Sequence, residues 1–231
     1  MYKIAVLVSG KGSTLDNLAF HCKDDFDGML YGAVDITHVM ADRECKAREV
    51  AEKWNLPFYV CNLDNLFEDR HGEVDLWTMG GFLSQIKVPD NLYGRVINVH
   101  PSYLPDYCGK GMYGIKVHEA VIAAKEQFTG VSVHVVDNEY DHGPVLERFK
   151  MAVLPWDNPT SLQLSVQDME HKLYPRAILD YLQLLNYQKY RTSEWWSEEE
   201  EKRFQEWNVP KLKEKGWRDE DIDKILGPAN T

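Results

Sequence analysis

Short apolar runs alternate with segments of helical spacing along the first 130 residues of the chain. The opening run is rich in β-branched residues and ends at a Ser-Gly pair, which is typical of a buried parallel strand. Strands are expected at residues 3–9, 31–40, 57–62, 74–82 and 95–100. Stripes of apolar residues three or four positions apart predict helices at 15–22, 47–54 and 117–124. This order predicts an α/β fold with a doubly wound, mostly parallel sheet.

The next two expected strands differ from the first five. Valines at 131, 133 and 135 alternate with Ser132 and His134, a pattern typical of a strand with one exposed face. A further strand is expected at 145–154, and it should pair with its predecessor in the antiparallel sense. We therefore expect the sheet to have an antiparallel edge.

A long helix is expected after residue 159. Thr160 and Gln163 offer a capping box at its start. Pro175 should kink or interrupt this helix, because proline has no N–H for the helical ladder. The main domain is expected to comprise residues 1–186.

Residues 187–231 are expected to form an acidic, Trp-rich helical C-terminal extension. Ser197 and Glu200 form a second expected capping box, and Gly227-Pro228 should end a final helix. Glu198 to Glu201 are expected to be a solvated helix start that suits the helix dipole. Four of the seven tryptophans lie in this extension: Trp195, Trp196, Trp207 and Trp217. Since monomers rarely expose large apolar patches, we expect the extension to pack on the main domain or on a partner.

The net charge and the cysteine spacing argue against several classes of partner and site. The sequence has 37 acidic and 26 basic residues and a formal net charge of −11. Nucleic acids and anionic membranes bind clustered Lys and Arg, so neither partner is expected. The four cysteines have no Cys-x-x-Cys spacing, which indicates neither a zinc site nor a disulfide framework. The first apolar run is too short for a signal peptide, and a cytoplasmic location is expected.

A glycine-rich turn joins the first expected strand to the first expected helix. The amides of Gly12, Ser13 and Thr14 lie at a helix N-terminus, where backbone N–H groups and the helix dipole attract phosphate. The turn also fits a purely structural role, with Ser13 as a helix cap. It is not the dinucleotide fingerprint, because Leu15 stands where the third glycine is required.

Asn98, His100 and Asp141 are the candidate catalytic residues. Asn98 and His100 close the run at 95–100, and side chains two positions apart on a strand share a face. Open α/β sheets bind ligands at the carboxyl ends of their strands. Asp141 lies in a turn-like Asp-His-Gly-Pro segment after the strand at 131–135. Each of the three also has an ordinary structural interpretation, in a turn, in the core or on the surface.

These three residue types together suit acyl transfer without a covalent enzyme intermediate. Asn98 and a protonated His100 can donate to an oxyanion, and Asp141 can raise the pKa of His100. Asp141 can also hold a water that carries a proton. Of the other histidines, only His134 and His142 are placed to touch such a site.

Six segments carry a resemblance to a known family. They are 3–15, 80–83, 97–105, 109–114, 141–144 and 170–175. In their order, and over about residues 1–186, they resemble the glycinamide ribonucleotide transformylase family of folate-dependent formyltransferases. The resemblance implies the Rossmann-like formyltransferase fold. It also implies formyl transfer from 10-formyltetrahydrofolate, the co-substrate, to the amine of glycinamide ribonucleotide in purine synthesis, with no metal.

The resemblance also implies which residues bind each substrate. Gly12, Ser13 and Thr14 would hold the phosphate of the small-molecule amine, with Pro101 near the amine and Glu170 on the ribose hydroxyls. The reduced folate would contact Leu83, Ser84, Gln85, Ile86, Asp137, Asn138, Glu139 and Tyr140.

The chain departs from the family pattern at two folate-binding positions. Many members have Arg where this chain has Ser84. A family arginine that helps to hold the folate has its nearest candidate in Arg70.

Four alternatives stay open at this point. An N-formyltransferase for another amine, such as an amino sugar nucleotide, fits the same residues. A 10-formyltetrahydrofolate hydrolase fits them too, although such hydrolases normally carry an additional N-terminal domain and this sequence begins at its first expected strand. A methionyl-tRNA formyltransferase is disfavoured by the acidic extension. In a different class, a nucleotide-binding oxidoreductase or a non-catalytic binding module would use the glycine turn alone. The oligomeric state is not indicated.

Overall fold

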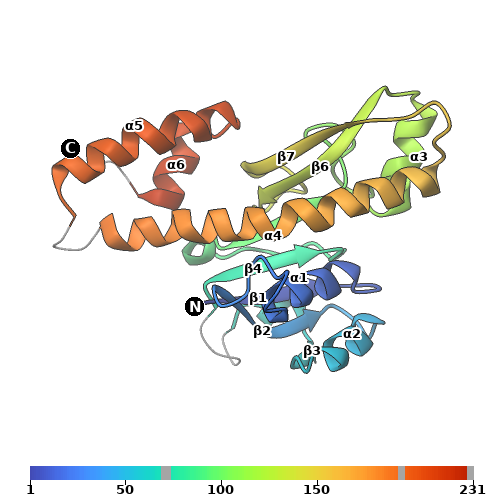
Figure 1. Cartoon of the computed structure of the whole chain (residues 1–231), viewed down its shortest axis with the longest axis horizontal. Helices are drawn as coiled ribbons and strands as arrows, with labels where there is room; N and C mark the ends of the chain where they lie inside the picture. The colour runs from blue at the N-terminus through green and yellow to red at the C-terminus, as the bar shows by residue number, and fades with distance from the viewer. Residues whose placement is uncertain (69–73, 192–195, 228–231) are drawn as a thin grey trace.

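One seven-stranded sheet forms the centre of the molecule (Figure 1). The computed structural model describes residues 1–68, 74–191 and 196–227. The strand order is β3-β2-β1-β4-β5-β6-β7. The first five strands in this order are parallel, and β6 and β7 are antiparallel to their neighbours. The strands are β1 (Tyr2–Val8), β2 (Val34–Ala41), β3 (Phe58–Val60), β4 (Leu76–Gly80), β5 (Val96–His100), β6 (Phe128–Val135) and β7 (Val145–Ala152). The predicted mostly parallel sheet with an antiparallel edge is confirmed.

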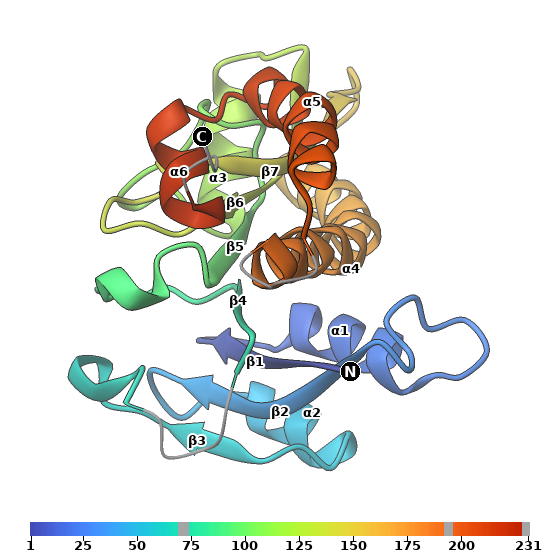
Figure 2. The same ribbon diagram turned by 90° about the vertical axis from the view of Figure 1, so that its left-hand side faces the viewer.

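Both faces of the sheet are covered, which explains why β1 reads as a continuous apolar run. Ile4, Val6 and Val8 belong to one buried cluster, whereas Ala5 and Leu7 belong to a second cluster on the opposite face. The first cluster includes apolar residues of the α-helices, and the second includes residues of the segment 66–92. In Figure 2, β5 to β7 lie with α5 and α6, away from β2 and β3.

Six α-helices and two short 3-10 helices are present in the described part of the chain. They are α1 (Ser13–Lys23), α2 (Ala47–Lys53), η1 (Leu63–Asn65), η2 (Asp90–Leu92), α3 (Ile115–Ala123), α4 (Pro159–Arg191), α5 (Glu198–Glu214) and α6 (Asp219–Leu226). None of the helices within the described ranges combines the length and apolarity needed to cross a bilayer.

The start of α4 corrects the predicted capping box. The side chain of Asn158, rather than Thr160, caps this helix by accepting hydrogen bonds from the amides of Thr160 and Ser161. Pro159 then occupies the first helical position, where a missing N–H has no cost. An Asn-Pro pair followed by two hydroxyl residues was the sequence signal for this cap.

The predicted interruption at Pro175 is also wrong, because α4 continues through it to Arg191. Tyr174, Ala177 and Ile178 flank the proline and are buried in the core. Burial of this stripe outweighs the roughly 3 kcal/mol that a proline costs inside a helix. The predicted boundary at residue 186 therefore lies within a helix.

The described part of the C-terminal extension (residues 187–231), which is 187–191 and 196–227, is folded against the rest of the chain. The Ser197–Glu200 capping box is present, and Gly227 follows the last residue of α6, as predicted. The expectation that Glu198 to Glu201 are all solvated is wrong for Glu201. Its carboxylate is buried against the Arg191 guanidinium, and this ion pair lowers the pKa of Glu201.

Candidate functional site

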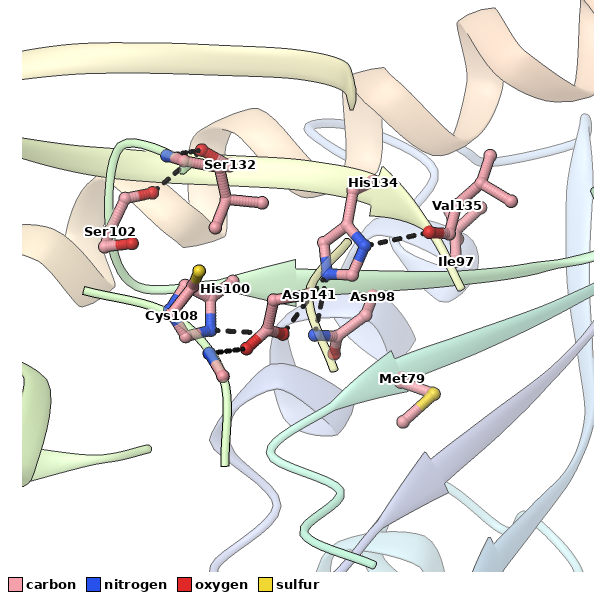
Figure 3. A network of polar contacts seen from close by, with 12 residues as sticks. Met79, Ile97, Asn98, His100, Ser102, Cys108, Ser132, His134, Val135 and Asp141 are labelled. Carbon is pink, nitrogen blue, oxygen red and sulfur yellow. Dashed lines mark hydrogen bonds and ion pairs between the residues drawn. The ribbon is translucent and has the colours of Figure 1, made fainter. Parts of the chain in front are cut away.

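Asn98, His100 and Asp141 converge at the carboxyl end of β5 (Figure 3). His100 Nδ1 lies 3.5 Å from Asp141 Oδ1. His134, on the neighbouring strand β6, joins them: its Nε2 lies 3.5 Å from the same Asp141 oxygen and 3.2 Å from Asn98 Nδ2. Asn98 and His134 are direct partners in the antiparallel register of β5 and β6. Strand alternation thus places Asn98 and His100 as expected, and cross-strand pairing adds His134.

The loop between β6 and β7 holds Asp141 in an uncommon backbone conformation. Asp141 has a φ of 54°, in the left-handed region that Asp tolerates better than most residues. The Gly109 amide donates to its second carboxylate oxygen, Oδ2, at 2.9 Å. This bond leaves Oδ1 directed at the two imidazoles.

The hydrogen bonds of the two histidines fix where their protons lie. His100 Nε2 lies 2.9 Å from the Tyr107 carbonyl, and His134 Nδ1 lies 2.9 Å from the Val135 carbonyl. A carbonyl oxygen only accepts, so each of these nitrogens carries a hydrogen. In the neutral rings, the other nitrogen of each histidine is then unprotonated and directed towards Asp141. The three acceptor atoms are His100 Nδ1, His134 Nε2 and Asp141 Oδ1, and a single proton between them is attracted by all three.

The pKa shifts separate the roles of His100 and Asp141. Burial lowers the pKa of His100, and this outweighs the opposite effects of Asp141 and the Tyr107 carbonyl. Asp141 acts on His100 in the expected direction, but the larger effect of burial makes the net shift of the His100 pKa a downward one. Burial raises the pKa of Asp141. The contact with His134, the field of His100 and the Gly109 amide together lower this pKa by more than burial raises it, so Asp141 is ionised.

An open pocket of about 420 Å³ adjoins this cluster. Asn98, His134 and Asp141 line it, whereas His100 does not. Every residue expected to contact a folate also lines it, except Leu83, which is partly exposed outside it.

Two walls of this pocket are joined by hydrogen bonds. The Asn138 side-chain oxygen accepts from the Val88 amide at 3.0 Å, and the Asn138 carbonyl accepts from Gln85 Nε2 at 3.2 Å. The segment after β4 and the loop after β6 therefore form one unit. Met79, Phe82 and Val136 complete the lining and were not predicted, because apolar residues at strand ends give no functional signal.

Ser84 is engaged in a way that the sequence did not indicate. Its hydroxyl donates to Asp42 Oδ2, and Asp42 pairs with Arg43 at 2.7 Å. The Asp42 side chain is almost fully buried, since 2% of it is exposed. Arg43 is thus the cation next to the position where many family members have arginine. Arg70, the candidate named from the sequence, lies outside the described residues.

The glycine turn lies at the N-terminus of α1, as expected. Gly12 precedes the helix with a φ of 80°, and a Cβ there would lie 2.9 Å from Ala47. Ser13 does not cap the helix. Its hydroxyl accepts from Gln167 Nε2 at 2.8 Å. Glycine at position 12 is therefore required by packing as well as by backbone conformation.

The turn is tied to Glu170 on α4. The Thr14 hydroxyl donates to Glu170 Oε1 at 2.7 Å. Burial raises the pKa of Glu170 to about 7, although the Thr14 hydroxyl opposes the shift. Glu170 and the turn residues Gly12, Ser13 and Thr14 thus lie together, whereas Pro101 is partly buried directly after β5.

Comparison with known proteins decides the family. Residues 2–178 match the protein family described as formyl transferase. The chain belongs to the formyl transferase family. The resemblance found in the sequence is thereby confirmed, and the match ends within α4, before the C-terminal extension of this formyl transferase.

Three of the similar proteins carry the name of one activity. A chloroplastic phosphoribosylglycinamide formyltransferase of Arabidopsis thaliana is 33% identical over 190 residues, which cover 76% of this chain and 64% of the relative. A phosphoribosylglycinamide formyltransferase of Haemophilus influenzae is 28% identical, over 77% of this chain and 86% of the relative. The solved structure of one from Anaplasma phagocytophilum is 27% identical, with a TM-score of 0.67 over 79% of this chain and 87% of the other.

The match to the plant relatives is partial. This chain spans 64% of the Arabidopsis protein and 59% of the Vigna unguiculata protein. The agreement with the solved structure confirms the fold of the formyl transferase.

Proposed function

We propose that this formyl transferase moves the formyl group of 10-formyltetrahydrofolate to the primary amine of glycinamide ribonucleotide. The observation that carries the proposal is the position of Asn98, His134 and Asp141 together in the lining of the pocket described above. The pairing of the glycine turn with Glu170 supports a phosphorylated ribose at the second substrate position. The names of the similar proteins agree with this reaction.

The proposed reaction needs one oxyanion donor and one proton carrier. The amine nitrogen attacks the formyl carbon, a C–N bond forms, and the carbonyl oxygen becomes an oxyanion. Asn98 uses one N–H on His134 Nε2, and its second N–H is available for this oxyanion.

Proton transfer completes the proposed reaction. Asp141, through a water, accepts the proton that the attacking amine loses and delivers it to N10 of the folate. The C–N10 bond then breaks, and tetrahydrofolate leaves. The unprotonated nitrogens of His100 and His134 stabilise the protonated state of Asp141 during this transfer. The co-substrate, the phosphorylated amine, a reaction without metal and a cytoplasmic location are parts of this proposal.

The test is an assay of the full chain with a 10-formyl folate analogue whose absorbance changes on deformylation. We expect turnover with glycinamide ribonucleotide, and little turnover with water alone or with an amino sugar nucleotide. Asn98→Ala should lower kcat about 10²–10³-fold, the usual effect of losing one oxyanion donor. Asp141→Asn should lower it about 10²–10⁴-fold, in the range of general acid–base catalysis.

The matched control is Asp25→Asn, which changes an exposed carboxylate in the loop after α1. It should leave kcat unchanged. Deformylation that proceeds equally without any amine would identify a hydrolase instead. Normal turnover of Asn98→Ala or Asp141→Asn would refute the roles proposed for them.

A further inference from the structure

The C-terminal extension contacts the backbone of β7 at the residues that follow the Asp141 loop. Trp217 Nε1 donates to the Val145 carbonyl at 2.8 Å. Lys215 Nζ donates to the Leu146 carbonyl at 2.7 Å and pairs with Glu147 at 2.8 Å. Trp217 is only 3% exposed, so its indole is buried at this contact. These contacts are made by residues outside the formyl transferase match at 2–178.

The two carbonyls lie at a β-bulge opposite His134. In the register of β6 and β7, Val133 pairs with Glu147 and His134 pairs with Val145, so Leu146 has no partner on β6. A bulge interrupts the ladder and redirects the chain next to it. The extension binds the carbonyl of the bulged residue and that of its neighbour. It therefore stabilises the irregularity at the point where the Asp141 loop rejoins the sheet.

The loop is packed tightly between this bulge and the site. Val135 N donates to the Pro144 carbonyl at 2.9 Å, and a Cβ at Gly143 would lie 2.0 Å from the Val135 carbonyl. Little space is therefore left for the chain between Asp141 and Val145 to shift alone. A displacement of Val145 is transmitted to Asp141, three residues before Pro144.

The extension is anchored a second time on the segment before β5. The Tyr93 hydroxyl donates to Asp221 at 2.9 Å, and a Cβ at Gly94 would lie 2.9 Å from the Ile225 side chain. Figure 1 shows α5 and α6 folded back beside α4, at the end of the molecule opposite α3. The extension thus contacts the segment just before β5, the strand that carries Asn98, and it also contacts the start of β7.

We propose that Trp217 is a positioning residue for the folate-binding loop at 137–144, and that the C-terminal extension acts as a brace for this loop. The inference rests on the proposed function, because only that function makes the loop at 137–144 a folate-binding loop. Residues of the loop line the pocket, whereas the phosphate turn and Glu170 lie on other elements. Loss of the brace lowers the fraction of molecules whose loop is in the binding conformation. This raises the apparent dissociation constant of the folate and leaves that of the other substrate unchanged.

The test is Trp217→Phe, which keeps the buried ring and removes the N–H. We expect the KM for the formyl folate to rise about five-fold, the factor that corresponds to one ordinary hydrogen bond. The KM for glycinamide ribonucleotide should stay unchanged. Lys215→Met should shift the folate KM in the same direction, and it is the deciding variant if Trp217→Phe does not fold. The matched control is Trp207→Phe on α5, where 68% of the side chain is exposed.

Hydrogen exchange separates this inference from the proposed function. In Trp217→Phe, amides at 137–146 should exchange faster than in the wild type, whereas those of β1 should not. If the wild type transfers no formyl group, the proposed function fails and faster exchange at 137–146 still supports the brace. A folate KM and loop exchange equal to wild type in both variants would overturn the inference. So would an equal rise of both KM values with a lower melting temperature, because that describes a merely structural role.

Discussion

Glu170 is the carboxylate of the site whose charge changes near neutral pH. Burial raises its pKa to about 7, above the ordinary value of 4.5. Ionised oxygens accept hydrogen bonds from ribose hydroxyls, whereas protonation removes part of this capacity. We predict that the ratio of the KM of Glu170→Gln to that of the wild type rises with pH through about 7, the midpoint of the Glu170 titration, and levels off above it. The KM for glycinamide ribonucleotide, measured for both proteins from pH 5.5 to 8.5, provides this ratio.

The same shift has a consequence of opposite sign for stability. The folded state binds the Glu170 proton more tightly than the unfolded state, so this group destabilises the fold as pH rises from 4.5 to about 7. Glu170→Gln should therefore gain stability relative to wild type over this window in thermal denaturation. Asp168→Asn, an exposed carboxylate on the same helix, is the control. A KM ratio that is independent of pH would contradict the role of Glu170.

Local patterns gave the residues of the site that lie on strand ends and turns. Alternation on β5 predicted Asn98 and His100, because two-residue spacing alone decides their common face. The contact of His134 with Asp141 depends on the register between β5 and β6, which is a non-local property. The net effect on the pKa of His100 could not be predicted either, since it depends on burial in three dimensions.

At the scale of elements, α4 and α5 are joined by a buried ion pair. Arg191 donates to both carboxylate oxygens of Glu201 and to the Leu226 carbonyl at the end of α6. Removing one partner of a buried pair leaves an uncompensated charge, which costs about 3–5 kcal/mol. We predict that Glu201→Leu lowers the free energy of unfolding by about this amount, as measured by urea denaturation.

Two further variants isolate the cause of this loss. Glu199→Leu breaks the exposed pair with Arg203 on the same helix and should cost less than about 1 kcal/mol. The double variant Arg191→Met/Glu201→Leu removes both charges and should recover part of the stability. If Glu201→Leu and Glu199→Leu were equally stable, the buried pair would have no special importance.

Elements could be predicted where their own residues determine them. The capping box at Ser197 and the end of α6 at Gly227 are local signals, and both are confirmed. The continuation of α4 through Pro175 was missed, because the compensating burial comes from the sheet below it. The β-bulge at Leu146 has no signal in the sequence, since it is defined by pairing with β6 and held by Lys215.

At the scale of the whole molecule, one helix connects the glycine turn and the end of β4 to the C-terminal extension. Near its middle, α4 carries Glu170, which accepts a hydrogen bond from the glycine turn, and Tyr174, whose hydroxyl donates to the Met79 carbonyl at the end of β4. At its end, Arg191 holds α5 and α6. The extension is therefore packed against the same core that carries the site, and we expect its opening to be coupled to that of the sheet.

We predict from this coupling that the sheet and the extension open together. In native-state hydrogen exchange, the slowest amides of β5 and of α6 should have opening free energies that agree within about 1 kcal/mol. A folate analogue at 100 times its Kd should raise both values by about 2.7 kcal/mol, because it binds only the folded state. Peptides around Phe26, which is 92% exposed, should exchange locally and not respond. Lower protection of α6 that is insensitive to the analogue would show that the extension opens independently, and would contradict the coupling.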